Sequence, residues 1–367
     1  MKTIMLVFGT RPEAIKMCPL VLELKKRKNV KILVCVTGQY REMLDDVLSV
    51  FGVTPDHDLR VMREGQTLAH VTSAVLLGME KVIAEESPDL LLVHGDTTTA
   101  FAAGLAAFYA KIPVGPGEAG LRTGNVSSPF PEEFNRLAVS AFAAYHFAPT
   151  EIARTNLLCE GKDPARIFVT GNTAIDALRY TVHGTYSHPV LKEAGGRRII
   201  LMTAHRRENI GEGMANIFSA VKRFAAAHPE VFFVYPVHPN PVVKNAAEEA
   251  LLGLDNVRLI PPLSAVDFHN FMARAYLVLT DSGGAQEEAP YFGVPVLVMR
   301  ETTERPEGIA AGTAMLIGTE TDDVYNAMEA LLRSPAKYAA MAHAENPYGD
   351  GYAAKKIADI LLGPDFF

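Results

Sequence analysis

Short runs of hydrophobic residues alternate along this chain with longer segments in which hydrophobic positions recur at helical spacing. The first run is Ile4 to Phe8. A Gly-Thr-Arg-Pro turn at residues 9–12 ends it, and a helical pattern with a basic last turn follows from Ala14 to Lys28. Strands that are separated by helices pair in parallel through right-handed crossovers. The pattern therefore predicts an α/β fold with parallel sheets.

The alternation continues through the first half of the chain and begins again after residue 196. The first half has predicted strands at Ile32–Thr37 and Leu90–His94, short strands near Val114, His146 and Ile167, and helices at Glu42–Val50, Leu68–Glu85 and Thr99–Tyr109. The second half has a predicted helix at Gly213–Ala227 and strands at Ile199–Thr203, Phe232–Val237, Val257–Ile260, Leu277–Thr280 and Val296–Met299. A looser segment, Thr181 to Gly196, separates the halves and places a domain boundary near residues 175–190.

The length of 367 residues exceeds what one hydrophobic core usually serves. We expect two domains, each with its own parallel sheet, that face a central cleft. Ligands of such sheets bind outside the carboxyl ends of the strands. The loops after Phe8, His94, Val114, Thr203 and Thr280 are therefore expected to line the cleft.

Composition narrows the classes of function. Hydrophobic residues make up 49% and charged residues 21%, which is typical of a globular protein with buried sheets, and the net charge of -7 argues against nucleic acid as a partner. Cys18, Cys35 and Cys159 form no close-spaced pair, so neither a disulfide framework nor a zinc site is expected. The N-terminal apolar run is too short for a signal peptide and residues 100–110 are too few to span a membrane, which favours a cytoplasmic protein without a membrane partner.

The segment from Asp281 to Pro290 has the pattern of a phosphate-binding turn between a strand and a helix. Gly283 and Gly284 allow the backbone to approach a ligand, and the N–H groups of the new helix attract a diphosphate. Glu288 falls one turn after Gly284, where a carboxylate can accept hydrogen bonds from a ribose. An ordinary turn with a solvated Glu288 fits this segment equally well.

Permanent cations gather in the turns that open the first helix of each half. They are Arg11 and Lys16 in the first half and Arg206 and Arg207, beside His205, in the second. Any one of them alone is expected on a solvated face, but the set outlines an anion site. Arg305 follows a later strand and adds a further candidate ligand for phosphate or carboxylate.

Acidic residues cluster in the loops of the first half. They are Asp96, Glu118, Glu132 and Glu133. Carboxylates that converge in a cleft repel one another and lose hydration, which raises at least one pKa toward the range that general acid–base catalysis needs. Simpler roles compete: Asp96 is also a candidate N-cap of the next helix, and for Glu133 we favour a first-turn helix charge.

Two histidines end predicted strands. His94 ends a buried one and is expected to be a core histidine with its hydrogen bonds satisfied. His238 ends another and is a candidate ligand contact.

The run at residues 115–120, Gly-Pro-Gly-Glu-Ala-Gly, matches the dinucleotide-binding pattern letter by letter. That pattern belongs in a first strand-to-helix turn, whereas a loop follows this run, so NAD is not expected. Neither a Walker A sequence nor a metal-ligand spacing is present. We expect no cofactor and no metal.

Eight motifs carry a family resemblance. They are FGTRPEAIK at 8–16, VHGDTT at 93–98, EAGLRT at 118–123, PEE at 131–133, HRREN at 205–209, SGG at 282–284 with Glu288, TTERPE at 302–307 and NPYG at 346–349. Together they resemble the non-hydrolysing bacterial UDP-N-acetylglucosamine 2-epimerases along essentially the whole chain.

The resemblance implies two Rossmann-like domains of the GT-B type, usually in a homodimer. Residues 1–175 would hold the catalytic carboxylates, residues 190–350 would bind UDP, and the last helix, within residues 352–367, would pack back on the first domain. The implied reaction converts UDP-GlcNAc reversibly to UDP-ManNAc for cell-surface polysaccharide synthesis. UDP leaves and returns through a 2-acetamidoglucal, without a cofactor.

The resemblance also implies roles for individual residues. The implied catalytic residues are Asp96, Glu118, Glu132 and His205, of which His205, with Arg11, stabilises the departing diphosphate. The implied substrate-binding residues are Arg11, Lys16, Phe268, Ser282, Gly283, Gly284, Glu288 and Arg305. An implied regulatory UDP-GlcNAc site comprises Gln39, Gln66, Arg207 and His238.

The chain departs from the family pattern at two places. Where the family usually reads Gly-His-Val-Glu-Ala-Gly, this chain has Pro116 and Gly117, which removes an imidazole and changes the loop beside Glu118. Leu263 replaces a glutamine that some members have near the base. Besides the epimerase, two alternatives therefore stay open: a GT-B glycosyltransferase that uses a UDP-sugar, and a UDP-sugar-binding homologue with impaired catalysis.

Overall fold

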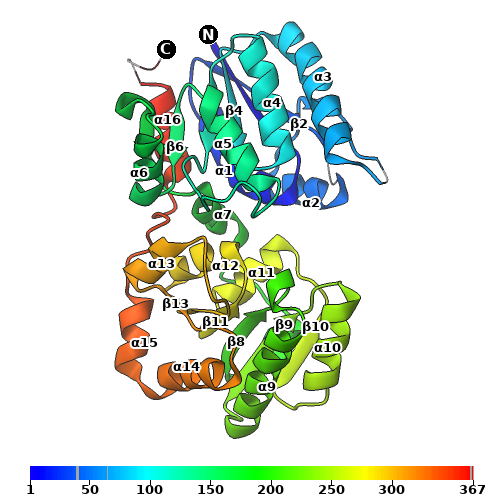
Figure 1. The fold of residues 1–367 in the computed structure, drawn as a ribbon, viewed down its shortest axis with the longest axis vertical. Coiled ribbons are helices and arrows are strands. Elements are labelled where there is room, and N and C mark those ends of the chain that lie inside the picture. Colours follow the sequence, from blue (N-terminus) through cyan, green and yellow to red (C-terminus); the bar gives the residue numbers. More distant parts are fainter. Residues whose placement is uncertain (39–40, 64, 364–365, 367) are drawn as a thin grey trace. The chain divides into compact units, whose positions relative to one another are not determined.

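The computed structural model describes all residues except 39–40, 64, 364–365 and 367, and side chains 41–43 are not described. The chain forms two compact units (Figure 1). The first unit comprises Met1–Tyr180 and Tyr348–Phe367, and the second comprises Thr181–Pro347. Each unit is built on its own parallel sheet, so the predicted α/β class with two Rossmann-like domains is confirmed.

The sheet of the first unit has the strand order β3-β2-β1-β4-β5-β6-β7 in the described residues. The strands are β1 Lys2–Phe8, β2 Val30–Val36, β3 His57–Asp58, β4 Leu90–His94, β5 Val114–Gly117, β6 His146–Ala148 and β7 Ile167–Val169. Because β1 lies between β2 and β4, the strand order reverses there, and the loops after β1 and β4 leave on opposite faces of the sheet.

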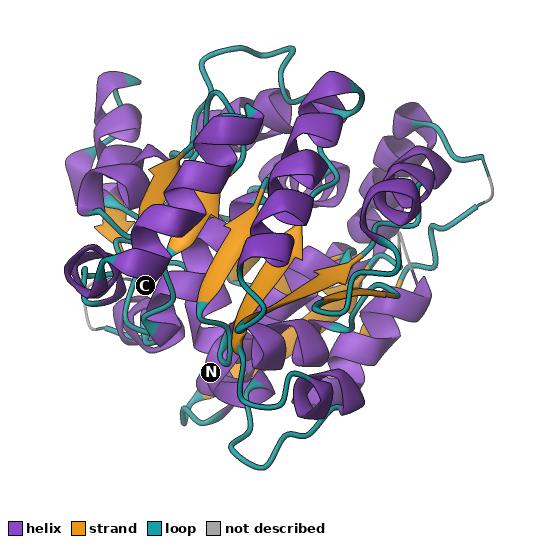
Figure 2. Cartoon of the chain, turned by 90° about the horizontal axis from the view of Figure 1, so that it is seen from below, coloured by secondary structure: helices purple, strands orange, loops and turns teal. Residues whose placement is uncertain are grey.

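Helices cover both faces of this sheet (Figure 2). The alternate strand residues Ile4, Leu6 and Phe8 pack with α1 (Arg11–Lys25), α2 (Arg41–Phe51), α7 (Thr173–Thr181) and α16 (Ala353–Leu361). Met5 and Val7 point the other way and pack with α3 (Leu68–Glu86), α4 (Thr98–Tyr109) and α5 (Glu132–Phe142). A small separate cluster holds α6 (Glu151–Cys159) against β6 and β7.

The second unit repeats this plan with the order β10-β9-β8-β11-β12-β13. Its strands are β8 Arg198–Thr203, β9 Val231–Pro236, β10 Val257–Ile260, β11 Leu277–Thr280, β12 Val296–Val298 and β13 Ala314–Leu316. On one face lie α9 Glu212–Ala227, α10 Pro241–Leu251, α14 Thr321–Arg333 and α15 Pro335–Ala342. On the other lie α8 Pro189–Glu193, α11 Ala265–Met272, α12 Gly283–Glu288 and α13 Pro306–Ala311.

Most predicted elements appear within a few residues of their expected bounds, and the differences have local causes. Helix α1 begins at Arg11 rather than Ala14, because Thr10 forms a capping box with Glu13 and Pro12 fits the first turn. The segment expected to be loose contains α8, which His188 caps. Strand β3, of two residues, and strand β13, of three, were not predicted.

The C-terminal helix α16 is tied to the first unit by a buried carboxylate. Asp176 of α7 accepts hydrogen bonds from the backbone N–H groups of Ala353, at 3.0 Å, and Ala354, at 2.8 Å. Burial raises the pKa of Asp176 to about 6, although these two N–H groups act in the opposite direction. The apolar face of α16, with Ile357 and Leu361, joins the core around α1.

A search of the described residues finds no helix that is both long and apolar enough to cross a membrane. The same residues contain no group of three or more His, Cys, Asp or Glu side chains arranged to hold a metal ion.

Candidate active site

The predicted functional residues lie where the strand order of each sheet reverses. In the first unit, Arg11 follows β1, Asp96 follows β4 and Glu118 follows the adjacent strand β5. In the second unit, His205 follows β8 and Ser282 follows β11, its neighbour. The carboxyl ends of adjacent parallel strands meet at one edge, so each unit gathers its own cluster.

Glu118 is the centre of the cluster in the first unit. Its carboxylate contacts Lys16 Nζ through Oε1, and the same oxygen accepts a hydrogen bond of 2.8 Å from Asn172 Nδ2. The side chain is only 6% exposed, and the backbone has a φ of 54°, which is uncommon for a residue other than glycine. A Cβ on Gly95 would lie 3.2 Å from Glu118 Oε2, so the loop after β4 also shapes the carboxylate's position.

The altered sequence before Glu118 does not remove the carboxylate from this cluster. Pro116 is buried within β5, and Gly117 ends that strand. The run that mimics a dinucleotide fingerprint continues into a turn, and the next helix is α5 at Glu132, so the fingerprint's context is missing. Lys16 of α1 and Asn172 after β7 contact the Glu118 carboxylate from other elements.

The expectation that His94 has satisfied hydrogen bonds was wrong for one ring nitrogen. The residue is buried at the end of β4, as predicted, but Nε2 has no hydrogen-bond partner among the described residues. This nitrogen lies 3.7 Å from Glu118 Oε2, which is longer than a hydrogen bond.

Asp96 is held by residues of α5 rather than by a capping role. Thr97 is the N-cap of α4, since its side chain accepts from Ala100 N, so the alternative of Asp96 as the cap was wrong. The Asp96 carboxylate contacts the Arg136 guanidinium, and its backbone carbonyl accepts from Asn135 Nδ2 at 2.8 Å.

The two glutamates at the start of α5 differ in their environments. Glu132 is half-buried at the helix N-terminus, where the helix dipole favours a carboxylate. Glu133 lies in the first turn, as expected, but it is buried and accepts from the backbone N–H groups of Thr123, at 3.0 Å, and Gly124, at 3.1 Å. It therefore anchors the loop that precedes α5.

The loops after β1 and β4 are joined through Glu13. Its buried carboxylate accepts from Gly9 N at 3.0 Å, Thr10 N at 2.8 Å and Thr97 Oγ1 at 2.6 Å. Burial raises the pKa of Glu13, against the effect of these donors. The first residue of α1, Arg11, is half-buried beside this junction.

In the second unit, Asp281 organises the basic loop after β8. This fully buried carboxylate accepts through Oδ2 from the backbone N–H groups of His205, at 2.7 Å, and Arg206, at 2.8 Å. Its Oδ1 lies 3.2 Å from His205 Nδ1. The His205 ring stacks on His238, with ring centroids 5.5 Å apart.

The imidazole of His205 favours its neutral form. Burial lowers the pKa of His205, Asp281 opposes this effect, and His238 and Arg206 add to it. A negatively charged ligand beside the ring would raise the pKa of His205 and so act in favour of the imidazolium.

The cations expected to form an anion site are largely paired with carboxylates. Arg206 donates to Glu304 at 2.9 Å, and buried Arg305 contacts Glu287. Burial raises the pKa of Glu304, but Arg305, Arg206 and Arg300 outweigh it and lower the pKa to about 2. The loop at residues 302–307 therefore carries fixed charges of both signs.

The two glycines of the predicted phosphate turn have different surroundings. A Cβ on Gly283 would lie 3.0 Å from Glu304 Oε1, so a side chain at this position would crowd the Glu304 carboxylate. Gly284 is exposed, and a Cβ there would lie 3.8 Å from Glu288 Oε1, which agrees with the predicted shared face. Ser282 is the N-cap position of α12 and makes no side-chain cap hydrogen bond.

Glu288, at the end of α12, is adjacent to α11. Its Oε2 lies 3.5 Å from Nε2 of buried His269, whose Nδ1 is 2.8 Å from Thr181 Oγ1. Phe268 precedes His269 and is half-buried in the core beneath α11, as is Leu263.

Of the residues predicted for a regulatory site, Gln66 belongs to the first unit, and Arg207 and His238 belong to the second. Gln39 lies outside the described residues. Gln66 precedes α3 and accepts from Arg63 N at 3.3 Å. Arg207 is exposed, and His238 is an exposed residue that stacks on His205.

Comparison with known proteins identifies the family. The family model of UDP-N-acetylglucosamine 2-epimerases matches residues 22–362. The chain belongs to this family. It is 56% identical over 359 residues to a UDP-N-acetylglucosamine 2-epimerase of Bacillus subtilis, covering 98% of this chain and 94% of that protein.

Two solved structures of ligand complexes resemble this epimerase-family chain over nearly its whole length. S. aureus MnaA in complex with UDP is 49% identical, with a TM-score of 0.92, and the match covers 100% of this chain and 98% of that one. The Neisseria meningitidis UDP-GlcNAc 2-epimerase bound to UDP-GlcNAc is 47% identical, with a TM-score of 0.90 and coverages of 98% and 99%.

The structure shows three further residues beside the predicted site residues, and the sequence analysis did not single them out. Asn172 and Arg136 contact the carboxylates Glu118 and Asp96, and Asp281 holds the loop of His205. Asn172 and Asp281 follow the strands β7 and β11, so their place at a carboxyl strand end was a usable signal. Arg136 lies inside a helix and gave no such signal.

Proposed function

We propose that this member of the family interconverts UDP-GlcNAc and UDP-ManNAc by inverting C2 of the hexose. A base removes the C2 proton, and the electron pair of the C2–H bond forms a double bond between C1 and C2. The C1–O bond breaks at the same time, and its electron pair leaves with UDP. The intermediate is a 2-acetamidoglucal. UDP then adds back to C1, and an acid returns a proton to the opposite face of C2, so atoms and electrons balance without a redox step.

The observation that carries the proposal is the environment of the Glu118 carboxylate. This carboxylate is nearly buried, held by Lys16 and Asn172 and placed at the carboxyl end of β5, in a chain that is 56% identical to a UDP-N-acetylglucosamine 2-epimerase. A positioned carboxylate of this kind suits proton transfer at carbon. We assign proton transfer to Glu118, with Asp96 and Glu132 as further acid–base groups.

Residues of the second unit, together with Arg11 and Lys16 of the first, are proposed to hold the nucleotide. We assign the diphosphate to Ser282, Gly283 and Gly284 with Arg11 and Lys16, the ribose to Glu288, and the base to Phe268. Arg305 supports this loop through Glu287 and Glu304. His205 stabilises the charge of departing UDP, because an anion beside its ring favours the imidazolium.

Deuterium incorporation tests this function. The protein is incubated with UDP-GlcNAc in D2O, and C2 of the recovered nucleotide sugars is examined by proton NMR. We expect deuterium at C2 and a signal of UDP-ManNAc. Free ManNAc with UDP would instead indicate a hydrolysing enzyme, and sugar transfer to an acceptor without C2 exchange would indicate a glycosyltransferase.

A UDP-sugar-binding homologue is the alternative that Pro116 and Gly117 raise. It would bind UDP-GlcNAc without C2 exchange, and replacing these residues by His and Val would restore exchange. The position of Glu118 favours the active enzyme, since its contacts with Lys16 and Asn172 do not depend on residues 116 and 117.

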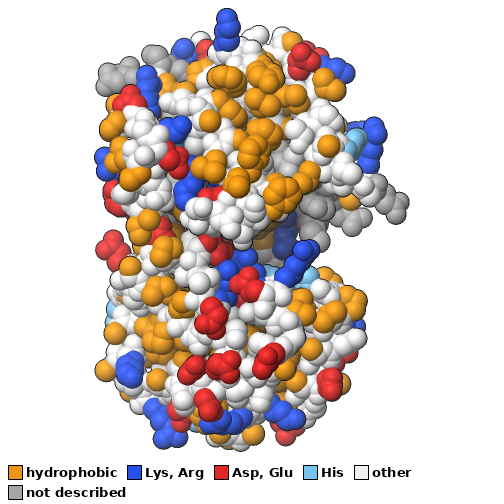
Figure 3. All heavy atoms as spheres, viewed as in Figure 1, with side chains coloured by type: hydrophobic (Ala, Val, Ile, Leu, Met, Phe, Trp, Pro, Cys, Tyr) orange, Lys and Arg blue, Asp and Glu red, His pale blue; other side chains and the backbone are white. Residues whose placement is uncertain are grey.

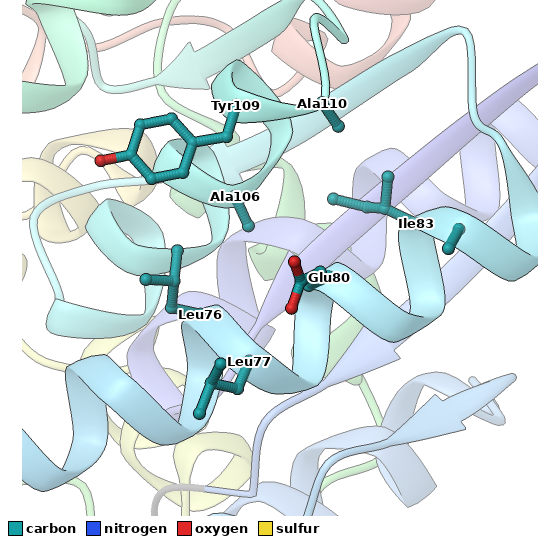
Figure 4. Close-up of a pocket in the computed structure, with 8 residues that line it drawn as sticks. Leu76, Leu77, Glu80, Ile83, Ala106, Tyr109 and Ala110 are labelled. Atoms are coloured by element: carbon teal, nitrogen blue, oxygen red, sulfur yellow. The ribbon is translucent and has the colours of Figure 1, made fainter.

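We further propose that the protein is a homodimer that buries an apolar surface on α3 and α4. Figure 3 shows hydrophobic side chains gathered over α4 and α5. Leu77 is 58% exposed, Phe108 51% and Tyr109 67%. A hollow of ≈ 480 Å³ lies between α3 and α4, and Leu76, Leu77 and Tyr109 line it around Glu80 (Figure 4). Exposed apolar patches of this kind mark interaction sites, and we assign this one to a second copy of the chain.

Sedimentation tests the dimer. Leu77→Glu places a charge on this surface and is expected to give a monomer at micromolar concentration. Leu252→Glu is the matched control, because Leu252 is 73% exposed in the second unit. A monomeric wild-type protein, or a Leu77→Glu variant that stays dimeric, would contradict the assignment.

The cellular setting follows from the same function. We infer that the protein works in the cytoplasm and supplies UDP-ManNAc for cell-surface polysaccharides.

Regulation by UDP-GlcNAc through Gln66, Arg207 and His238 also stays a proposal, with Gln39 as a further candidate. A sigmoidal dependence of rate on UDP-GlcNAc concentration would support it.

A further inference from the structure

Gly117 and His94 form a pair on adjacent strands. In the ladder between β4 and β5 they are direct partners. A Cβ on residue 117 would lie 2.4 Å from His94 Nδ1, closer than two such atoms can approach. The imidazole therefore occupies space that any other residue at position 117 would fill. Gly117 has no positive φ, so its backbone conformation does not require glycine.

The ring admitted by Gly117 presents an unused nitrogen to the proposed base. His94 is 3% exposed, and Nε2 has no partner among the described residues. Burying a ring nitrogen without a hydrogen bond costs free energy. The closest described carboxylate oxygen, Glu118 Oε2, is 3.7 Å away, so a shift of less than about 1 Å brings it within hydrogen-bonding distance.

The other oxygen of Glu118 is occupied from different elements. Lys16 of α1 and Asn172 after β7 contact Oε1, whereas Oε2 faces His94 and Gly95. A donor on the Oε2 side helps to fix the rotation of the carboxylate plane.

We propose that His94 is a positioning residue for Glu118. In the reacting state its Nε2–H donates to Oε2 and sets the orientation in which the carboxylate exchanges a proton with substrate. Gly117 makes this possible by leaving room for the ring. The inference rests on the proposed function and adds to it a specific pair of residues, one of which has no side chain.

Two substitutions of His94 separate positioning from packing. Glutamine places its side-chain N–H near the position of Nε2, whereas phenylalanine keeps a ring of similar shape without a donor. We expect His94→Gln to retain kcat within about threefold, and His94→Phe to lose at least tenfold in kcat with KM changed less than twofold. His146→Phe is the control, because His146 is equally buried on β6 of the same sheet but outside the cluster, and its turnover should stay unchanged.

Gly117 provides an independent test. Gly117→Ala should displace the ring and lower kcat at least tenfold in the wild-type background. In a His94→Ala background, where no ring is present, the same substitution should change kcat less than twofold. This non-additivity is the signature of a direct coupling. Equal losses in both backgrounds would overturn the proposal, and so would wild-type turnover in His94→Phe or equal kcat losses in the Phe and Gln variants.

A spectroscopic measurement distinguishes failure of this inference from failure of the proposed function. The imidazole ¹⁵N shifts of His94 report the hydrogen bond of Nε2 whether or not the protein turns over. They should differ between the wild type and Glu118→Gln in the presence of UDP. Absence of C2 exchange in the wild type would remove the proposed function, whereas unchanged ¹⁵N shifts would remove the pairing of His94 with Glu118.

Discussion

Replacing Glu118 by glutamine tests the carboxylate on which the proposed chemistry depends most. The amide keeps the size of the side chain and an oxygen that can accept hydrogen bonds from Lys16 and Asn172. In the wild type, Asn172 Nδ2 lies 2.8 Å from Glu118 Oε1. It cannot take up a proton from carbon. Removing a general acid–base group usually costs about 10²–10⁴ in rate. We expect turnover and C2 exchange to fall by that factor, and a thousandfold loss equals about 4 kcal/mol in the barrier.

The same substitution has a smaller effect on stability. The side chains of Lys16 and Glu118 are 21% and 6% exposed, so Lys16 can still reach water when its partner loses its charge. We therefore expect a loss of about 1–2 kcal/mol in the free energy of unfolding, below the 3–5 kcal/mol typical of a broken buried pair. A loss of this size leaves the variant folded, so it does not account for the fall in turnover.

Three measurements decide the outcome for Glu118→Gln. Turnover and deuterium exchange are followed by NMR, UDP affinity by calorimetry and stability by urea denaturation. UDP affinity should stay within about twofold, because we assign UDP mainly to other residues. Glu23→Gln is the control, since Glu23 makes surface ion pairs from the same helix, α1. Turnover within threefold of the wild type would remove Glu118 from the mechanism, and a parallel loss of UDP affinity would make it a binding residue.

The remaining predictions concern two other titratable groups. Asp176→Ala removes the acceptor of two N–H groups at the start of α16, and we expect a loss of about 2–4 kcal/mol in unfolding free energy together with faster amide exchange in that helix. Because burial raises the pKa of Asp176 from 3.8 to about 6, its stabilising contribution is complete below pH 4 and is lost as the pH rises through 6. The stability of the wild type relative to Asp176→Asn should therefore fall by about 2 kcal/mol between pH 4 and pH 7 in urea denaturation, and a pH-independent difference would refute this. For His205, whose pKa burial lowers, an anionic ligand favours protonation, so UDP-GlcNAc should bind more tightly as the pH falls from 8 to 6. Calorimetry should show that His205→Gln loses this dependence, and a variant that keeps it would exclude His205 as the source.

The sequence by itself determined the α/β class, the bounds of the longer strands and the family. Strands such as Leu90–His94 and Leu277–Thr280 were predictable because both faces of a parallel sheet are covered and each strand is one apolar run. Motifs at strand ends made Glu118 and His205 candidate site residues, since parallel strands bring their carboxyl ends to one edge.

Only the tertiary structure decided how those residues are held. Asn172, Arg136 and Asp281 contact candidate site residues that lie from 40 to 76 positions away in the chain, a separation at which sequence spacing gives no distance. Gly117 and His94 lie on different strands, and the ladder that pairs them is fixed by packing of the whole sheet. Hydrophobic patterns specify elements because burial acts on each segment, whereas side-chain contacts depend on the register between segments.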